Sequence, residues 1–301
     1  MQIAFLYALV VLIWGSTWAA ITFQLGPVAA EVSVAYRFAI AALLLFAFAG
    51  ITRRDVRIPM HQYPLVIVQG ALLFSANYFF VYYAAARVTT GLIAVIFSTI
   101  VLFNAFFERL FFGLPVERRL ILGSLLGLAG VALLFWPEVA EFALRDRAVS
   151  GVLMSLAAVL VASLGNMAAV VNTRHSLPVL AVNAHAMAWG ALSSAVAATV
   201  LGRQFDFSTE PAYVWSLLYL AAFGSAIAFG GYLVLIRRIG AARAAYSSVL
   251  FPLVALTIST VLEGYRWTTP AFAGMTLIMA GNWLALSRLT GQRRAVPDRK
   301  Q

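Results

Sequence analysis

The sequence contains no cysteine among its 301 residues and a single lysine, Lys300. The missing cysteine excludes disulfide bonds, thiolate metal ligands and a cysteine nucleophile. The missing lysines exclude a Schiff-base site in the body of the chain. Charged residues make up 11% of the chain, whereas a soluble domain averages about 25%. This composition argues against a water-soluble globular protein.

The chain also lacks the short motifs that bind nucleotides or metals. It has no Gly-x-x-x-x-Gly-Lys-Ser/Thr loop and no His-Glu-x-x-His helix. Its apolar segments hold no set of His, Asp and Glu residues that could ligate a metal. We therefore expect no cofactor, no metal and no enzymatic activity.

Long apolar runs dominate the sequence. Hydrophobic residues make up 63% of it, and the mean hydropathy is +0.92. A bilayer core ~30 Å thick is crossed by about 20 apolar helical residues. The first run has neither a basic n-region nor an Ala-x-Ala-like site, so we expect it to remain as a helix. The sequence predicts an all-α integral membrane protein with ten transmembrane helices, near 3–22, 32–50, 63–84, 90–111, 119–136, 150–172, 178–201, 212–236, 243–262 and 270–288.

The two halves of the chain repeat each other at a spacing of 151 residues. The matching pairs are Pro27 and Pro178, Arg87 and Arg238, Gly113 and Gly264, Gly123 and Gly274, and Gly130 and Gly281. Each half has five spans, an odd number, so the second half must enter the membrane from the opposite side. Two inverted repeats around a site at mid-membrane are typical of secondary transporters. We expect one repeat at 1–137, an outer connecting loop at 138–149, the second repeat at 150–289 and a basic tail at 290–301.

The net charge of +10 is unevenly distributed. The side of the membrane that holds both termini carries fifteen basic residues, the other side carries five, and Arg37 lies within a span. The positive-inside rule therefore predicts cytoplasmic termini and a location in the cytoplasmic (inner) membrane. The basic tail is interpreted as an anchor on the lipid bilayer surface, and no nucleic-acid partner is expected because no motif or aromatic platform accompanies it.

The first span carries Trp14-Gly15-Ser16-Thr17-Trp18 near its middle. Trp14 and Trp18 are one helical turn apart, so both can face one side. Tryptophan in membranes usually lies at the interfaces, so this pair indicates either tight helix packing or a cavity wall that stacks on substrate. Polar and aromatic residues in other spans can share either role. The predicted substrate-binding residues are Trp14, Ser16, Trp18, Asn77, Tyr78, Tyr82, Asn166 and Tyr246.

These residues resemble a known family. Trp14–Trp18, then Pro27, then Tyr36-Arg37-Phe38 are similar to the start of an EamA-type unit of the drug/metabolite transporter superfamily, and Pro252, Glu263, Gly274 and Gly281 to its end. The resemblance covers nearly the whole chain. It implies ten helices around a central cavity lined by spans 1–4 and 6–9, and transport of small metabolites, often export of amino acids. The first repeat departs from the pattern, because Val101 and Phe112 stand opposite Pro252 and Glu263.

Four residues are candidates for gating or coupling. Arg37 either extends to the outer interface, or acts as a gate partner or a contact for an anionic substrate group. His185, predicted deep in its span, is a neutral hydrogen-bonding residue or a proton carrier. Pro252 is a static kink or a hinge. Glu263 forms an interfacial ion pair or couples protons, and Glu108 is its possible counterpart in the first repeat.

Glycines in the fifth and tenth spans predict close helix packing, within one chain or across a homodimer. We expect a secondary transporter, an exporter of a small organic metabolite such as an amino acid, working by alternating access. The alternatives are a translocator of lipids or lipid-linked metabolites, a passive facilitator, and a structural or signalling membrane protein without a sizeable cavity.

Overall fold

The structure is a computed structural model that describes residues 2–26, 28–88, 90–134, 136, 146–175, 177–254, 257 and 268–286. Pro27, Glu263, most of the predicted outer loop and the basic tail lie outside these residues. All regular secondary structure in the described part is helical. The predicted all-α class is therefore confirmed for this part of the chain.

The helices of the first half are α1 (Gln2–Thr22), α2 (Ala30–Ile51), η1 (Met60–Gln62), α3 (Tyr63–Ala71), η2 (Leu72–Ala76), α4 (Asn77–Ala85), α5 (Thr90–Phe97), α6 (Ile100–Phe112) and α7 (Arg118–Leu134). Those of the second half are α9 (Asp146–Arg174), α10 (Val179–Val200), α11 (Pro211–Tyr219), η3 (Leu220–Ile227), α12 (Ala228–Ile239), α13 (Ala241–Ala245), η4 (Tyr246–Leu250) and α15 (Thr269–Leu286).

Six continuous helical segments among the described residues are long and apolar enough to cross a membrane. They are Ile3–Thr22, Ala30–Ile51, Met60–Ala85, Val149–Arg174, Val179–Val200 and Pro211–Ile239. The other predicted spans coincide with shorter described helices: α5 with α6, α7, the helical run Ala241–Val254, and α15.

The predicted span 90–111 is interrupted between α5 and α6. The Ser98 hydroxyl donates to the carbonyl of Ala94 at 2.9 Å, and the Thr99 hydroxyl donates to that of Ile96 at 2.6 Å. Side chains of this kind offer the backbone an alternative to regular helical bonds. Hydropathy does not detect such a turn, because the residues around it are apolar.

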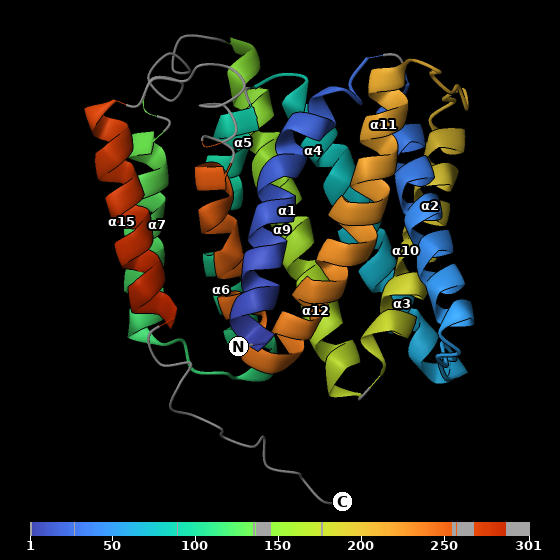
Figure 1. Ribbon diagram of the computed structural model, residues 1–301, viewed down its shortest axis with the longest axis horizontal. Helices are drawn as coiled ribbons and strands as arrows, with labels where there is room; N and C mark the ends of the chain where they lie inside the picture. The colour runs from blue at the N-terminus through green and yellow to red at the C-terminus, as the bar shows by residue number, and fades with distance from the viewer. Residues whose placement is uncertain are drawn as a thin grey trace, which may run out of the picture.

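The helices stand side by side in the bundle (Figure 1). The α7 and α15 helices form a pair at one edge of the bundle, whereas α2 packs along α10 at the other. Helix α1 begins and α15 ends at the same end of the bundle. Helices α1, α4, α6, α9 and α12 stand between these two edges.

Glycines let α7 and α15 approach closely. A Cβ on Gly123 would lie 2.6 Å from the carbonyl oxygen of Gly281, and one on Gly130 would lie 2.5 Å from that of Gly274. The glycines that raised the possibility of a homodimer are thus engaged inside one chain. The homodimer itself stays a prediction.

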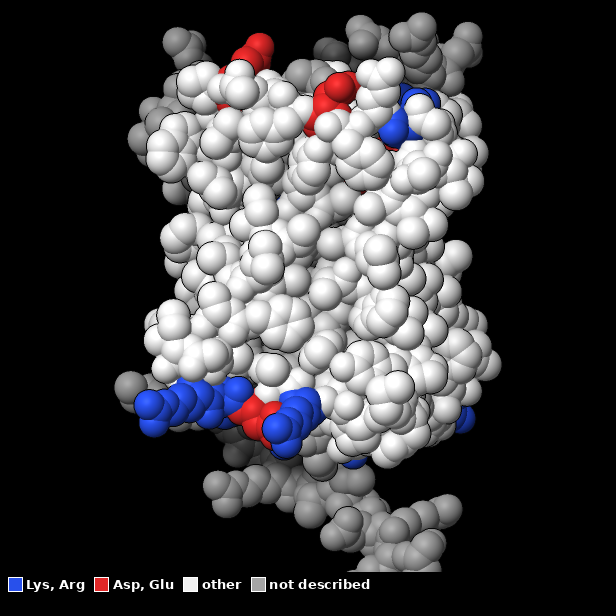
Figure 2. Space-filling view, turned by 90° about the vertical axis from the view of Figure 1, so that its right-hand side faces the viewer, with Lys and Arg blue, Asp and Glu red and all other residues white. Residues whose placement is uncertain are grey.

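The two ends of the bundle differ in charge. The basic end includes residues 52–59, 113–117, 175, 177, 178 and 240. There Arg243 pairs with Glu117, and the Arg174 guanidinium lies 4.0 Å from the centre of the Phe112 ring. The opposite end includes residues 23–26, 28–29, 86–88 and 201–210. Figure 2 shows one face of the molecule, with an uncharged band between charged ends. Such a band fits the hydrocarbon core of a bilayer.

At the opposite end, the buried carboxylate of Glu31 joins both halves of the chain. It accepts a hydrogen bond from the Tyr83 hydroxyl and lies 3.7 Å from Nε of Arg203, which belongs to the segment 201–210.

Replacing Gly123 by Ala is expected to destabilise the protein by about 1–3 kcal/mol, because the new methyl group meets the backbone of α15. Heating the detergent-solubilised protein and measuring the remaining folded fraction by size-exclusion chromatography checks this. The matched control is Gly230→Ala in α12, where a Cβ meets nothing within 4 Å. Equal melting temperatures for both variants would show that the close approach of α7 and α15 is not needed.

Candidate functional site

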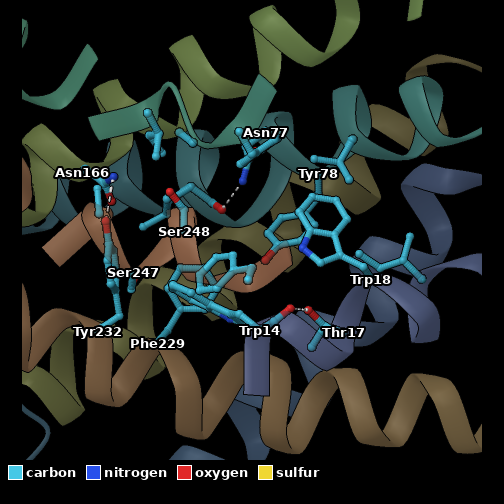
Figure 3. Close-up of a pocket in the computed structure, with 18 of the residues that line it drawn as sticks. Trp14, Thr17, Trp18, Asn77, Tyr78, Asn166, Phe229, Tyr232, Ser247 and Ser248 are labelled. Carbon is cyan, nitrogen blue, oxygen red and sulfur yellow. Dashed lines mark hydrogen bonds between the residues drawn. The ribbon is translucent and has the colours of Figure 1, made fainter. Parts of the chain in front are cut away.

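A cavity lies between the two halves of the bundle at mid-depth. It offers about 90 Å³ to the centres of water-sized molecules, several times what one water molecule needs. Figure 3 shows the labelled side chains directed at this space from both halves of the chain. The cavity is lined by Trp14, Thr17, Trp18, Ile21, Arg37, Leu73, Asn77, Tyr78, Val81, Phe97, Ile100, Ala162, Asn166, Phe229, Tyr232, Ala245, Ser247, Ser248 and Phe251.

Trp14 forms an aromatic wall of the cavity. Its indole nitrogen donates a hydrogen bond to the carbonyl of Gly224 at 2.9 Å. Its ring lies 4.7 Å from the Phe229 ring, 5.0 Å from the Tyr232 ring and 5.7 Å from the Phe251 ring, measured between centroids. Edge-to-face contacts of this kind fix the orientation of the indole. Trp14 is therefore held in place by the second half of the chain.

Arg37 points into the protein interior and not to the interface. It is 1% exposed. Its Nε donates to the Ser225 hydroxyl at 2.9 Å, and its Nη2 donates to the Tyr78 hydroxyl at 3.3 Å. The guanidinium lies 4.4 Å from the centre of the Tyr78 ring, a favourable cation–π distance. The charge of Arg37 therefore belongs to the cavity.

The third span of each half contains a π-helical segment beside the cavity. These segments are η2 in the first half and η3 in the second, and they overlap when the sequence is shifted by 151 residues. Segments of π-helix often occur at functional sites because they shift the hydrogen-bonding register of the backbone. In η3, Gly224 and Ser225 supply the acceptors for Trp14 and Arg37.

Five buried polar atoms of the cavity wall have no hydrogen-bond partner among the described residues. Two of them are donors, Nη1 of Arg37 and Nε1 of Trp18, and two are acceptors, Oδ1 of Asn77 and of Asn166. The fifth is the hydroxyl of Ser248, which can both donate and accept a hydrogen bond. A buried polar atom left without a partner costs about 1–3 kcal/mol. These atoms are therefore available to a bound molecule or to water.

A polar network closes the interior between the cavity and the basic end. Asn166 donates from Nδ2 to the Tyr232 hydroxyl at 3.2 Å and to Oδ1 of Asn104 at 3.4 Å. The Ser163 hydroxyl donates to the same Asn104 oxygen at 2.6 Å. The network joins α6 and α9 to α12.

Two side chains of α6 extend this network to the start of α13. Asn104 donates from Nδ2 to the carbonyl of Ala241 at 3.2 Å, and Glu108 accepts from the backbone N–H of Ala241 at 2.7 Å. Both backbone groups of one residue are thus bound by side chains one helical turn apart. Gly240, with φ of 85°, forms the turn that presents them. The first half of the chain thereby holds the second half at the basic end.

The structure brings together most of the predicted substrate-binding residues. Trp14, Trp18, Asn77, Tyr78 and Asn166 line the cavity with Arg37. Their role in binding stays a prediction.

Three other predicted residues do not line the cavity. The Ser16 hydroxyl contacts carbonyls of its own helix and the Tyr219 hydroxyl. Tyr246 donates to the carbonyl of Gly123 at 2.7 Å and packs against the α7–α15 pair. Tyr82 is buried, and its hydroxyl has no partner among the described residues.

The gating candidates lie in different places. His185 lies about two turns into α10, and its Nε2 lies 3.0 Å from the Val56 carbonyl at the basic end. Its role as a hydrogen-bonding residue or a proton carrier stays a prediction. Pro252 is buried, directly after the 3-10 segment η4 that contributes Ser247 and Ser248 to the cavity. Glu263 lies outside the described residues. Within those residues, no cluster of His, Asp and Glu could hold a metal.

The sequence analysis missed several apolar wall residues, although the repeat contained a signal for them. Four pairs of wall residues are separated by 151 positions: Tyr78 and Phe229, Val81 and Tyr232, Phe97 and Ser248, and Ile100 and Phe251. Shifting Tyr78 by the repeat length would have identified Phe229. Part of the cavity wall is thus built from equivalent positions of the two halves.

The profile of the EamA-like transporter family matches residues 1–136 and again residues 149–287. The chain belongs to the EamA-like transporter family. The two matches cover both halves that contribute to the cavity. The protein is accordingly an integral membrane transporter.

Relatives of this EamA-like protein carry transporter names. It is 28% identical over 262 residues to the uncharacterized inner membrane transporter YedA of Escherichia coli K12, covering 86% of this chain and 82% of that one. It is 28% identical over 294 residues to a probable amino-acid metabolite efflux pump of Salmonella typhimurium, covering 93% of both. A protein of known crystal structure shares the fold, with a TM-score of 0.78 at 20% identity over 94% of this chain and 96% of that one.

Replacing Trp14 by Ala is expected to lower transport by this EamA-like protein about tenfold, because the change removes an aromatic wall with three ring contacts. Folded yield in detergent should fall much less. The matched control is Trp215→Ala, since Trp215 is 71% exposed. A parallel loss of yield and transport in the Trp14 variant would mean that Trp14 serves packing alone.

Proposed function

We propose that this protein is a secondary transporter that exports a small organic metabolite from the cytoplasm by alternating access, with amino acids and related compounds as the first class. The observation that carries the proposal is the cavity between the halves, whose wall combines equivalent positions with unpartnered polar atoms.

We further propose that the chain has ten transmembrane helices arranged as two inverted five-helix repeats. Reciprocal contacts support this. Gly123 contacts Gly281, which is the repeat equivalent of Gly130. Gly130 in turn contacts Gly274, which is the repeat equivalent of Gly123. Trp14 against Gly224 and Gly165 against Leu73 form a second reciprocal pair. Inverted halves give two facing states by rocking against each other around one site.

The charge distribution supports an orientation. Because cytoplasmic loops carry an excess of arginine and lysine, the basic end corresponds to the cytoplasmic side of the inner membrane, with both termini there. The hydrogen-bonded network of Asn104, Ser163, Asn166 and Tyr232 then separates the cavity from the cytoplasm. Export requires this network to break when the carrier turns towards the cytoplasm.

The composition of the wall supports a small amphipathic substrate. Aromatic rings offer apolar surface, while the amide oxygens of Asn77 and Asn166 and the N–H groups of Arg37 and Trp18 offer hydrogen bonds. An α-amino acid presents matching donors, acceptors and an apolar side chain. The name of the Salmonella relative, an amino-acid metabolite efflux pump, agrees with this class. A lipid chain would leave the same polar atoms unpaired.

The absence of native cysteine allows a direct test of alternating access. In a Ser247→Cys variant, a membrane-impermeant thiol reagent should react more slowly from the basic side, because the polar network blocks that path. Adding Asn104→Ala should accelerate the reaction from the basic side and slow it from the opposite side, since opening one end closes the other. Labelling is measured by mass spectrometry.

Two control variants define the sides in this experiment. Thr52→Cys at the basic end and Thr209→Cys at the opposite end are exposed and should each react from one side only. Acceleration from the basic side without slowing from the opposite side would instead indicate a continuous pore, and hence a passive facilitator.

Everted membrane vesicles test the direction and the substrate class. Vesicles that contain the protein should accumulate at least one member of a set of radiolabelled amino acids above vesicles that lack it, because uptake into everted vesicles corresponds to export. Uptake should be abolished when the gradient that drives it is collapsed with ionophores. Equal accumulation with and without the protein for the whole set would refute the amino-acid assignment.

A further inference from the structure

The guanidinium of Arg37 is buried without a carboxylate partner among the described residues. Two ion pairs of the described residues join Arg203 to Glu31 and Arg243 to Glu117, and neither includes Arg37. Around Arg37 the acceptors are neutral, the hydroxyl of Ser225 and the hydroxyl of Tyr78. Neutral acceptors replace part of the hydration of the cation but do not neutralise it, so the positive charge remains in the cavity.

The remaining wall does not compensate this charge. None of the residues that line the cavity among the described ranges is Asp or Glu. Glu31, one end of the Arg203 pair, lies six residues before Arg37 on α2, about 9 Å along the helix axis. An anion that enters the cavity therefore meets one net positive charge.

The geometry leaves one part of the guanidinium available. Nε and Nη2 are engaged, the Tyr78 ring covers one face, and Nη1 has no partner although it is buried. The engaged atoms fix the orientation of the side chain, so binding does not have to order it. The indole N–H of Trp18, also unpartnered, is a second donor in the same wall.

We propose that Arg37 binds a carboxylate of the transported molecule and thereby restricts this carrier to substrates with a single anionic group. This inference rests on the proposed transport function and names the substrate chemistry of the same cavity. One guanidinium neutralises one negative charge, so a dianion such as a phosphate monoester would bring an uncompensated charge into the interior. The unpartnered oxygens of Asn77 and Asn166 then accept from an amine or hydroxyl elsewhere on the substrate.

Matched pairs of small molecules test this proposal on the wild-type protein. The probes are phenylalanine, leucine, 3-phenylpropionate and 4-methylpentanoate, each compared with its primary amide, which keeps the shape and removes the negative charge. The amides of phenylalanine and leucine keep a protonated amine, so the two amine-free pairs, whose amides are neutral, decide the comparison. Ligand-dependent thermal stability measures binding to the full-length protein in nanodiscs. Quenching of the tryptophan fluorescence, to which Trp14 and Trp18 contribute among the seven tryptophans, is a second readout. Carboxylates are expected to bind at least about tenfold more tightly than their amides.

Variants assign the effect to one side chain. Arg37→Gln should weaken carboxylate binding by about 10- to 100-fold and weaken amide binding much less. Arg37→Lys should recover part of the affinity because it restores the charge. The matched control is Arg87→Gln, which removes an exposed arginine at the opposite end of the bundle. The comparison of wild-type carboxylate and amide stands even where Arg37→Gln does not fold.

Several outcomes would overturn the proposal. The first is that the amides bind as tightly as the carboxylates, and the second is that no carboxylate of the panel binds. The third is that chloride alone stabilises the wild-type protein but not Arg37→Gln, which would mean that Arg37 binds an inorganic anion. If the amides are transported at the full rate, the proposed carboxylate binding by Arg37 is refuted, whereas the transporter assignment stands. Failure of transport for every compound in the everted vesicles would instead remove the proposed function.

Discussion

A polar side chain inside a membrane has to find its hydrogen-bond partner within the protein, because lipid offers none. Most buried polar groups of this bundle obey that constraint locally, as Ser124 does by donating to the carbonyl of Leu120 one turn earlier. Several polar groups at the cavity find partners for only some of their atoms, or for none. Arg37, Trp18, Asn77, Asn166 and Ser248 keep unpaired atoms where two sets of helices meet. The position of these unpaired atoms is what distinguishes the centre of the bundle from ordinary packing, and the transport proposal depends on it.

The sequence predicts the helical class and the repeat. It predicts only in part which face of each helix is turned towards the cavity. Trp14 and Trp18 could be identified because tryptophan is unusual at mid-depth. Tyr246 could not be assigned correctly, since a span that is apolar on nearly every side does not reveal which face meets a cavity and which meets α7. The hydrogen-bonding distance between His185 and the Val56 carbonyl could not be predicted either, because hydropathy does not show which loop folds against a helix.

Phe229 and Phe97 illustrate a different limit. A phenylalanine in a membrane span is ordinarily interpreted as a contact with lipid, and nothing about its own chemistry marks a binding site. Their position becomes informative through the repeat, because Tyr78 and Ser248 occupy the equivalent sites in the other half. The π-helical segments η2 and η3 were not predicted either, because a shift in backbone register leaves no trace in hydropathy.

The two halves are equivalent in position but not in charge. The residue 151 positions after Arg37 is Ala188, so the guanidinium has no counterpart across the cavity. In the proposed alternating-access cycle, identical halves would give the two facing conformations equal energies. A single cation carried by one half would remove this equality, and the empty carrier would then populate one orientation in excess. Such a bias would set the resting occupancy of the carrier and its apparent affinity on each face, whereas the direction of net flow would still follow the gradient that drives it.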